Sequence, residues 1–113
     1  MEIAERRLAE KNRTINEVSE ISKQLKHKCT VVLIGSYARG DFNLWSDIDL
    51  LVVGNFKNAN PVERFNEIDF PPGYELILLK PEEFEKMKRK NNKFIADTYN
   101  EGVVLRDDFK LFE

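Results

Sequence analysis

The fold is decided by residues 31–54, which read VVLIGSYARGDFNLWSDIDLLVVG. Two apolar runs in this stretch have the composition of buried strands, and each carries small or polar residues where a buried strand would not. The first run ends in Gly35-Ser36, a pair that lets a ligand approach the backbone closely and can begin a short helix whose free N–H groups face an anion. Gly35 and Ser36 are therefore a candidate phosphate-binding turn.

The second run, residues 47–53, is apolar except for two aspartates. At the period of a β-strand, Asp47 and Asp49 project from the same face, roughly 7 Å apart along the strand. Carboxylates on one apolar face repel each other and lose hydration unless a cation lies between them. Divalent cations such as Mg²⁺ take oxygen ligands of this kind and bring substrate phosphates with them. We interpret the two aspartates as a candidate metal site.

The Gly-Ser pair, ten intervening residues and Asp47-Ile48-Asp49 between apolar neighbours resemble the signature of a known superfamily. They resemble the nucleotidyltransferases of the DNA polymerase β superfamily, in particular the small stand-alone proteins called minimal nucleotidyltransferases. An isolated Asp-x-Asp would carry little information. Here the small pair, the spacing, both aspartates and the flanking strands agree, so the resemblance is specific.

Composition indicates one ordinary domain, which we expect to span residues 1–113, with 42% apolar and 34% charged residues. No apolar run approaches the ~20 residues of a membrane span, and the amino end lacks the apolar core of a signal peptide. We therefore expect a cytoplasmic protein without a membrane partner. The single cysteine, Cys29, is expected in the core. A net charge of −2 argues against a surface that binds nucleic acid throughout.

The order of elements predicts an α/β (α+β) fold, a mixed β-sheet backed by helices, and the resemblance implies the polymerase β-like palm. Residues 1–27 form an amphipathic pattern, with a capping box at 14–17 that leaves open a break near Asn12. Its apolar stripe either covers the sheet, which we favour, or docks a partner. Gly102 is expected as a left-handed cap residue. The expected strands are 30–34, 47–53, 74–79 and 103–106, and the expected helices are 1–27, 36–39, 60–69, 80–90 and 94–99.

A third carboxylate is expected near the two aspartates. Glu75 is the single charge in the apolar run 74–79. The resemblance implies that the third carboxylate comes from the strand after the crossover helix, which favours Glu75, with Asp69 at the end of the expected helix as the alternative. Relatives often carry Asp at this position, and the longer Glu either contacts metal directly or orients the acceptor.

The resemblance implies transfer of a nucleoside monophosphate, with AMP from ATP expected, to an acceptor hydroxyl, and release of pyrophosphate. Asp47, Asp49 and Glu75 would hold two Mg²⁺ ions. Gly35 and Ser36 would bind the triphosphate of ATP or another nucleoside triphosphate. Arg39 either contacts a phosphate or forms a surface ion pair. Trp45 either covers a nucleotide base or packs in the core or at its rim.

The resemblance also implies a partner, because larger members of the superfamily carry an extra helical domain that shapes the acceptor site. Many minimal nucleotidyltransferases are encoded beside an all-helical HEPN-domain protein, act as its antitoxin and in some cases adenylylate it. We expect such a protein or a homodimer to complete the acceptor site, with a small molecule or an RNA end as less favoured acceptors. The opposing hypothesis is a non-catalytic protein that neutralises a partner by binding alone.

Overall fold

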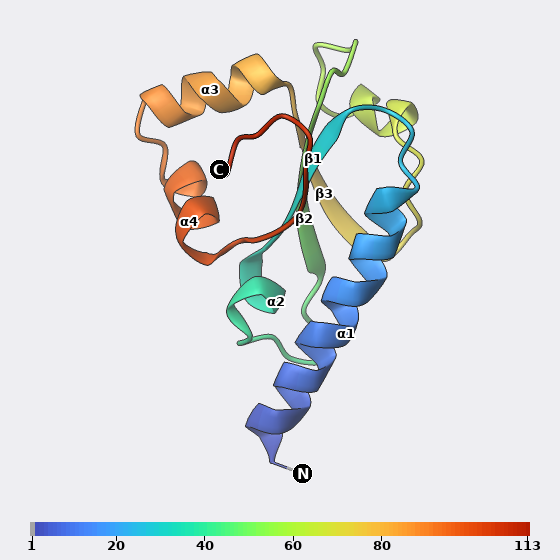
Figure 1. Cartoon of the computed structure of the whole chain (residues 1–113), viewed down its shortest axis with the longest axis vertical. Coiled ribbons are helices and arrows are strands. Elements are labelled where there is room, and N and C mark those ends of the chain that lie inside the picture. The colour runs from blue at the N-terminus through green and yellow to red at the C-terminus, as the bar shows by residue number, and fades with distance from the viewer. Residues whose placement is uncertain (1) are drawn as a thin grey trace.

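A four-stranded mixed sheet organises the computed structural model, which describes residues 2–113 (Figure 1). The strand order is β3-β2-β1-β4. Strand β1 is antiparallel to β2 and β4, whereas β2 is parallel to β3. The mixed sheet predicted from the sequence is confirmed. The strands are β1 (Cys29–Ile34), β2 (Ile48–Gly54), β3 (Tyr74–Leu79) and β4 (Val103–Asp107).

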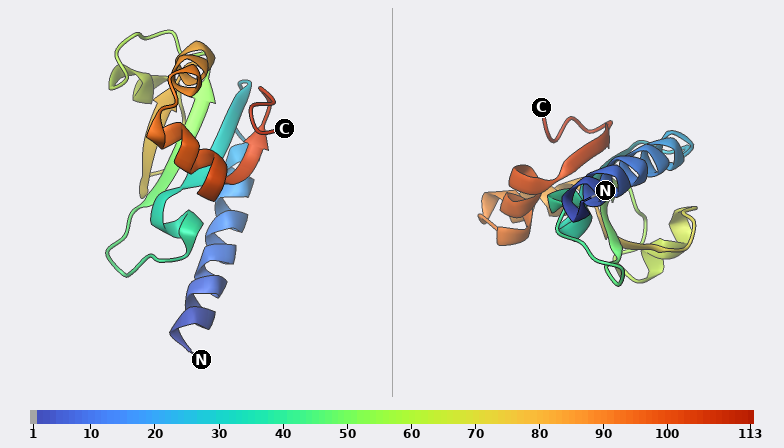
Figure 2. Two further views of the ribbon diagram at one scale, coloured as in Figure 1. Left: turned by 90° about the vertical axis from the view of Figure 1, so that its left-hand side faces the viewer. Right: turned by 90° about the horizontal axis from the view of Figure 1, so that it is seen from below.

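Helices cover both faces of the sheet (Figure 2). One face packs against α1, whose Val18 is fully buried against the sheet. The other face packs against α3 and α4 through Phe84 and Ile95. Because both faces are covered, β1 and β2 are buried along almost their whole length, which explains their continuous apolar sequences. The helices are α1 (Ile3–Lys23), α2 (Gly35–Arg39), α3 (Pro81–Arg89) and α4 (Lys93–Glu101).

The first helix, α1, is continuous through Asn12, so the expected break does not occur. It ends at Lys23, earlier than predicted, and leaves His27 exposed in the connection to β1. Only its second half covers the sheet, while its first turns project beyond the sheet and expose Ile3 and Leu8 (Figure 1). No helix within residues 2–113 is long and apolar enough to cross a membrane.

The helix expected over residues 60–69 is wrong, because the structure has only a 3₁₀ helix, η1 (Glu63–Glu67). The predicted start signal is present, since Asn60 Oδ1 accepts a hydrogen bond from the Val62 N–H. The segment then wraps around the fully buried Arg64, which donates to the backbone carbonyls of Asn58 and Ala59. These tertiary hydrogen bonds hold the chain in a tight coil, so a longer amphipathic helix does not form.

Gly102 ends α4, but not in the left-handed conformation expected of it, since its φ is −66°. The reason for glycine is space. A Cβ atom at this position would lie 2.5 Å from the Thr98 carbonyl oxygen and 2.8 Å from Val32 Cγ1. Glycine therefore lets the end of α4 pack directly onto β1.

Candidate active site

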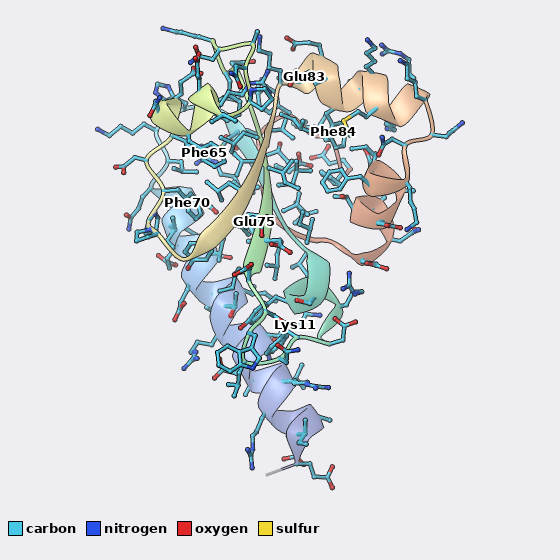
Figure 3. The ribbon with its side chains drawn as sticks, turned by 180° about the vertical axis from the view of Figure 1, so that it is seen from behind. Lys11, Phe65, Phe70, Glu75, Glu83 and Phe84 are labelled. Carbon is cyan, nitrogen blue, oxygen red and sulfur yellow. The ribbon has the colours of Figure 1, made fainter. Side chains whose placement is uncertain are left out.

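Asp49 and Glu75 are neighbours across the parallel strands β2 and β3, where they are paired residues in the register. Both line a cavity of about 280 Å³ on the face of the sheet covered by α3 and α4. Figure 3 labels Glu75, which lies near the start of β3. Gly35 and Arg39 also line this space, which we call the carboxylate cavity. The fold thus brings four of the predicted site residues together.

Gly35 is the point where β1 gives way to α2, and its φ of +71° lies in the left-handed region that glycine adopts readily. A Cβ atom at Gly35 would lie 2.6 Å from Asp49 Oδ2. Glycine is therefore required twice here, once for the backbone angle and once because the Asp49 carboxylate lies against the first residue of α2. The spacing between the Gly-Ser pair and the aspartates therefore has a structural reason, which is the packing of the Asp49 carboxylate against Gly35.

The Asp49 carboxyl group lies in a crowded electrostatic environment. Burial raises its pKa above the ordinary value, and the charges of Glu75 and Asp47 raise it further, while Arg39 opposes them. Each of these carboxyl groups offers oxygen atoms, which are the donors that Mg²⁺ prefers. A cation at this position would relieve the repulsion, so the donor set fits a magnesium ion.

Asp47 lies just before β2, and it is exposed. Strand β2 therefore begins one residue later than expected, and Asp47 lies directly before it, where its charge still acts on Asp49. The cause is a hydrogen-bonded turn immediately before it, in which the Asn43 N–H donates to Ser46 Oγ at 2.9 Å. Within residues 2–113, no three His, Cys, Asp or Glu side chains gather closely enough to hold a metal ion by themselves.

Ser36 and Arg39 both belong to α2. The Ser36 carbonyl accepts hydrogen bonds from the backbone N–H groups of Gly40 and Asp41, which closes the helix. Arg39 donates through Nε to Asp41 at 3.1 Å and through one terminal nitrogen to Glu101 at 3.4 Å. The predicted ion pair of Arg39 is present, and the same guanidinium borders the carboxylate cavity.

Asp69, the alternative third carboxylate, lies elsewhere. It borders a separate cavity of about 920 Å³ between the end of α1 and the segment before β3. The structure therefore places Glu75, and not Asp69, beside Asp49.

Helix α4 supplies one wall of the carboxylate cavity, which the sequence did not predict. Phe94, Asp97, Thr98 and Glu101 all line it. Asp97 forms an ion pair with Lys93 one turn earlier, a spacing that by itself indicates only an exposed helix face. The contribution of α4 depends on how the helix packs across the sheet, and no local sequence signal reports that packing.

A carboxylate pair beside the first residue of a helix can hold a metal ion and a phosphate group next to each other. Residues 12–111 match the nucleotidyltransferase domain family, and the chain belongs to that family.

One relative supports this assignment by its sequence, and one solved structure shares the fold. A Methanocaldococcus jannaschii protein named "Putative protein adenylyltransferase" is 32% identical over 75 residues, which cover 66% of this chain and 75% of that protein. A crystal structure described as a "putative nucleotidyltransferase from Sulfolobus solfataricus" shares the fold, with a TM-score of 0.53 and 23% identity, covering 88% of this chain and 82% of that one.

Proposed function

We propose that this chain transfers AMP from ATP to a hydroxyl group on a partner protein. The observation that carries the proposal is the side-by-side position of Asp49 and Glu75 next to Gly35 at the start of α2. In the reaction, the acceptor oxygen forms a bond to the α-phosphorus of ATP. The bond from that phosphorus to the bridging oxygen breaks, and pyrophosphate leaves.

Each residue has a role in this proposal. The backbone N–H groups at Gly35 and Ser36, with the Ser36 hydroxyl, bind the triphosphate. Asp49 and Glu75 hold Mg²⁺, and Asp47 joins them from the end of the turn before β2. When bound, the two ions lower the pKa of the attacking hydroxyl and neutralise the leaving pyrophosphate. Glu75, which is exposed at the cavity, accepts the proton of the hydroxyl or orients it.

The proposed acceptor is a protein because the Methanocaldococcus jannaschii relative is named for protein adenylylation. The resemblance to minimal nucleotidyltransferases extends the proposal to a HEPN-domain protein as acceptor and to an antitoxin role for this chain.

A second candidate function is neutralisation of the partner by binding alone. The apolar side chains of Ile3 and Leu8, which the first turns of α1 leave exposed, favour it. The Asp47→Ala/Asp49→Ala double variant separates the two functions. Retained neutralisation of the partner supports binding alone, whereas lost neutralisation with an intact complex supports catalysis.

The direct test uses ATP labelled at the α-phosphate, MgCl₂ and the protein encoded beside this chain, with mass spectrometry to locate the added AMP. Glu75→Gln should lower the transfer rate about 10²-fold or more, because it removes a contact that stabilises the transition state. Asp69→Asn is the matched control and should leave the rate unchanged. Transfer at the wild-type rate by Glu75→Gln would exclude the proposed site.

A further inference from the structure

The turn at residues 43–46 presents two large apolar side chains to solvent. Leu44 is 95% exposed and Trp45 is 89% exposed. Two adjacent large apolar side chains left in water mark a surface that another molecule can cover. Trp45 therefore does not pack in the core, and we call this segment the Leu44–Trp45 turn.

The Leu44–Trp45 turn is a fixed part of the fold. The Trp45 N–H donates to Asn43 Oδ1 at 2.9 Å, and the Ser46 N–H donates to the Asn43 carbonyl at 3.1 Å. Immediately before the turn, Phe42 is buried and its ring stacks on Tyr37 of α2, with 3.9 Å between the ring centroids. The backbone that carries the two exposed side chains is thus held before any partner arrives, which reduces the backbone entropy lost on binding.

The position of the turn connects it to the proposed chemistry. It joins α2 to β2, so it lies between the Gly35-Ser36 pair and Asp49 along the chain, and Asp47 follows Trp45 by two residues. It lies at the same end of the molecule as the free first turns of α1, where Leu8 is exposed (Figures 1 and 2). A molecule that covers Trp45 would lie two residues from Asp47, whose charge acts on the Asp49 carboxyl group.

Charge indicates which class of molecule fits. Residues 40–47 contain two aspartates and neither lysine nor arginine. The carboxylate cavity is lined by four acidic side chains and by Arg39 as its one basic side chain, all within residues 2–113. Beside Trp45 itself, a protein segment with lysine or arginine next to an apolar pocket would be attracted to Asp47, whereas the phosphates of a nucleic acid would be repelled there.

We infer that the Leu44–Trp45 turn is the docking element for a protein acceptor, which receives Trp45 in an apolar pocket flanked by basic residues. This inference rests on the proposed function, because the docked protein is the one that receives AMP. It adds where that protein binds and which charge its binding surface carries. Exposed tryptophan that becomes buried at the centre of an interface is the residue type that most often dominates binding energy.

The first test reads Trp45 directly, because it is the only tryptophan in the chain. Replacing it with 5-fluorotryptophan gives one ¹⁹F resonance. The probes are a leucine- and tyrosine-containing peptide flanked by lysines, the same peptide with glutamates in place of the lysines, and a single-stranded RNA oligonucleotide. We expect the resonance to shift with the lysine peptide only. A shift with RNA, a shift that depends on the concentration of the chain alone, or no shift with any probe would overturn the inference.

The second test measures AMP transfer to the lysine peptide. Trp45→Ala should raise the KM for the peptide about ten- to thirty-fold, as truncation of a central tryptophan does, and should leave the KM for ATP unchanged. Trp45→Phe should recover part of the loss. The matched control is Phe65→Ala, since Phe65 is 48% exposed and lies toward the opposite end of the molecule from the first turns of α1 (Figure 3).

The proposed function and the docking surface would be refuted by different results. A ¹⁹F shift without AMP transfer by the wild type would refute the proposed function and leave the docking surface standing. Transfer with equal KM values in wild type and Trp45→Ala would refute the docking surface and leave the function standing.

Discussion

Asp49 shows how a single carboxyl group can be placed at the expense of stability. Its pKa in the folded protein is raised by burial and by the charges of Glu75 and Asp47. A raised pKa means that the folded state binds the proton more tightly than the unfolded state does. The free energy of unfolding therefore falls as pH rises from the ordinary value of 3.8 through the raised one, and the full penalty is present above that interval.

Asp49→Asn should accordingly keep or increase the free energy of unfolding at pH 7, although it removes a proposed metal ligand. The difference from wild type should disappear only near pH 3 and below, because the unfolded carboxyl keeps its ordinary pKa of 3.8 and is protonated there as the folded one is. Urea unfolding at pH 7 and pH 3 measures it, with Asp69→Asn as the control. Adding Mg²⁺ should stabilise the wild type and not the variant. A large loss of stability at neutral pH would contradict the crowding described here.

A second carboxyl group, that of Glu83 on α3, has a lowered pKa instead of a raised one and therefore stabilises the fold at neutral pH. It accepts hydrogen bonds from both terminal nitrogens of the buried Arg64, at 2.7 and 3.0 Å. One of these nitrogens also donates to the Leu78 carbonyl of β3. The hydrogen bond from Arg64 is the main reason that the pKa of Glu83 lies below its ordinary value, with burial opposing it.

Glu83→Gln should lower the free energy of unfolding at pH 7 by about 2–3 kcal/mol, because it removes the carboxylate that is hydrogen-bonded to a buried guanidinium. A lowered pKa gives stability that is complete above the ordinary value of 4.5 and is lost as pH falls through the folded value. The difference between variant and wild type should therefore shrink in acid. Glu82→Gln, an exposed neighbour on the same helix, is the control, and an equal effect there would refute the role of Arg64.

Two glycines at the ends of helices are needed for different reasons, Gly102 because space is lacking and Gly40 because of its backbone angle. Gly102→Ala should destabilise the protein by about 1–3 kcal/mol through overpacking against β1. Gly40 has a φ of +87° and open space around it, so Gly40→Ala should cost about 1–2 kcal/mol through strain.

Asparagine distinguishes the two causes. Gly40→Asn should recover part of the loss, because asparagine tolerates the left-handed region, whereas Gly102→Asn should lose more than alanine because it is larger. Thermal unfolding of the four variants measures this comparison. A gain from Gly102→Asn relative to Gly102→Ala would contradict the close packing of α4 on β1.

The elements that the sequence predicted well are those whose pattern is set locally. β3 has the bounds expected for it, β1 begins one residue earlier than expected and β2 is shifted by one residue at both ends, because continuous apolar runs define central strands. The prediction of a helix over 60–69 was wrong because the buried Arg64 fixes the conformation of that segment through its hydrogen bonds to Glu83 of α3. Gly35, Asp49 and Glu75 were found together from their motif and their strands. The α4 wall of the cavity was not, since it depends on helix packing alone.

Mg²⁺ and ATP should stabilise the whole molecule in a fixed order, with Mg²⁺ first. Mg²⁺ should raise the melting temperature by relieving the repulsion among the carboxylates, and ATP should raise it further. A ligand at 100 times its Kd adds about 2.7 kcal/mol, which is several degrees for a domain of this size.

ATP without divalent metal should stabilise the protein little, because its phosphates would face bare carboxylates. Ser36→Ala should weaken the effect of ATP more than that of Mg²⁺. Differential scanning fluorimetry with and without EDTA measures both effects. Equal stabilisation by ATP in EDTA, or no response to millimolar concentrations of either ligand, would show that the chain keeps the fold without a metal-bridged triphosphate site.

The sheet order gives the two neighbouring carboxylates unequal freedom to change during evolution. Asp49 lies on a central strand with its oxygen against Gly35, so neither residue can be enlarged without displacing the other. Glu75 is exposed on the edge strand β3, which has one neighbour instead of two. A lineage can therefore shorten, lengthen or replace the side chain at position 75 and keep the protein folded. New acceptor chemistry in such proteins is expected to arise from the β3 side, while Gly35 and Asp49 change only together.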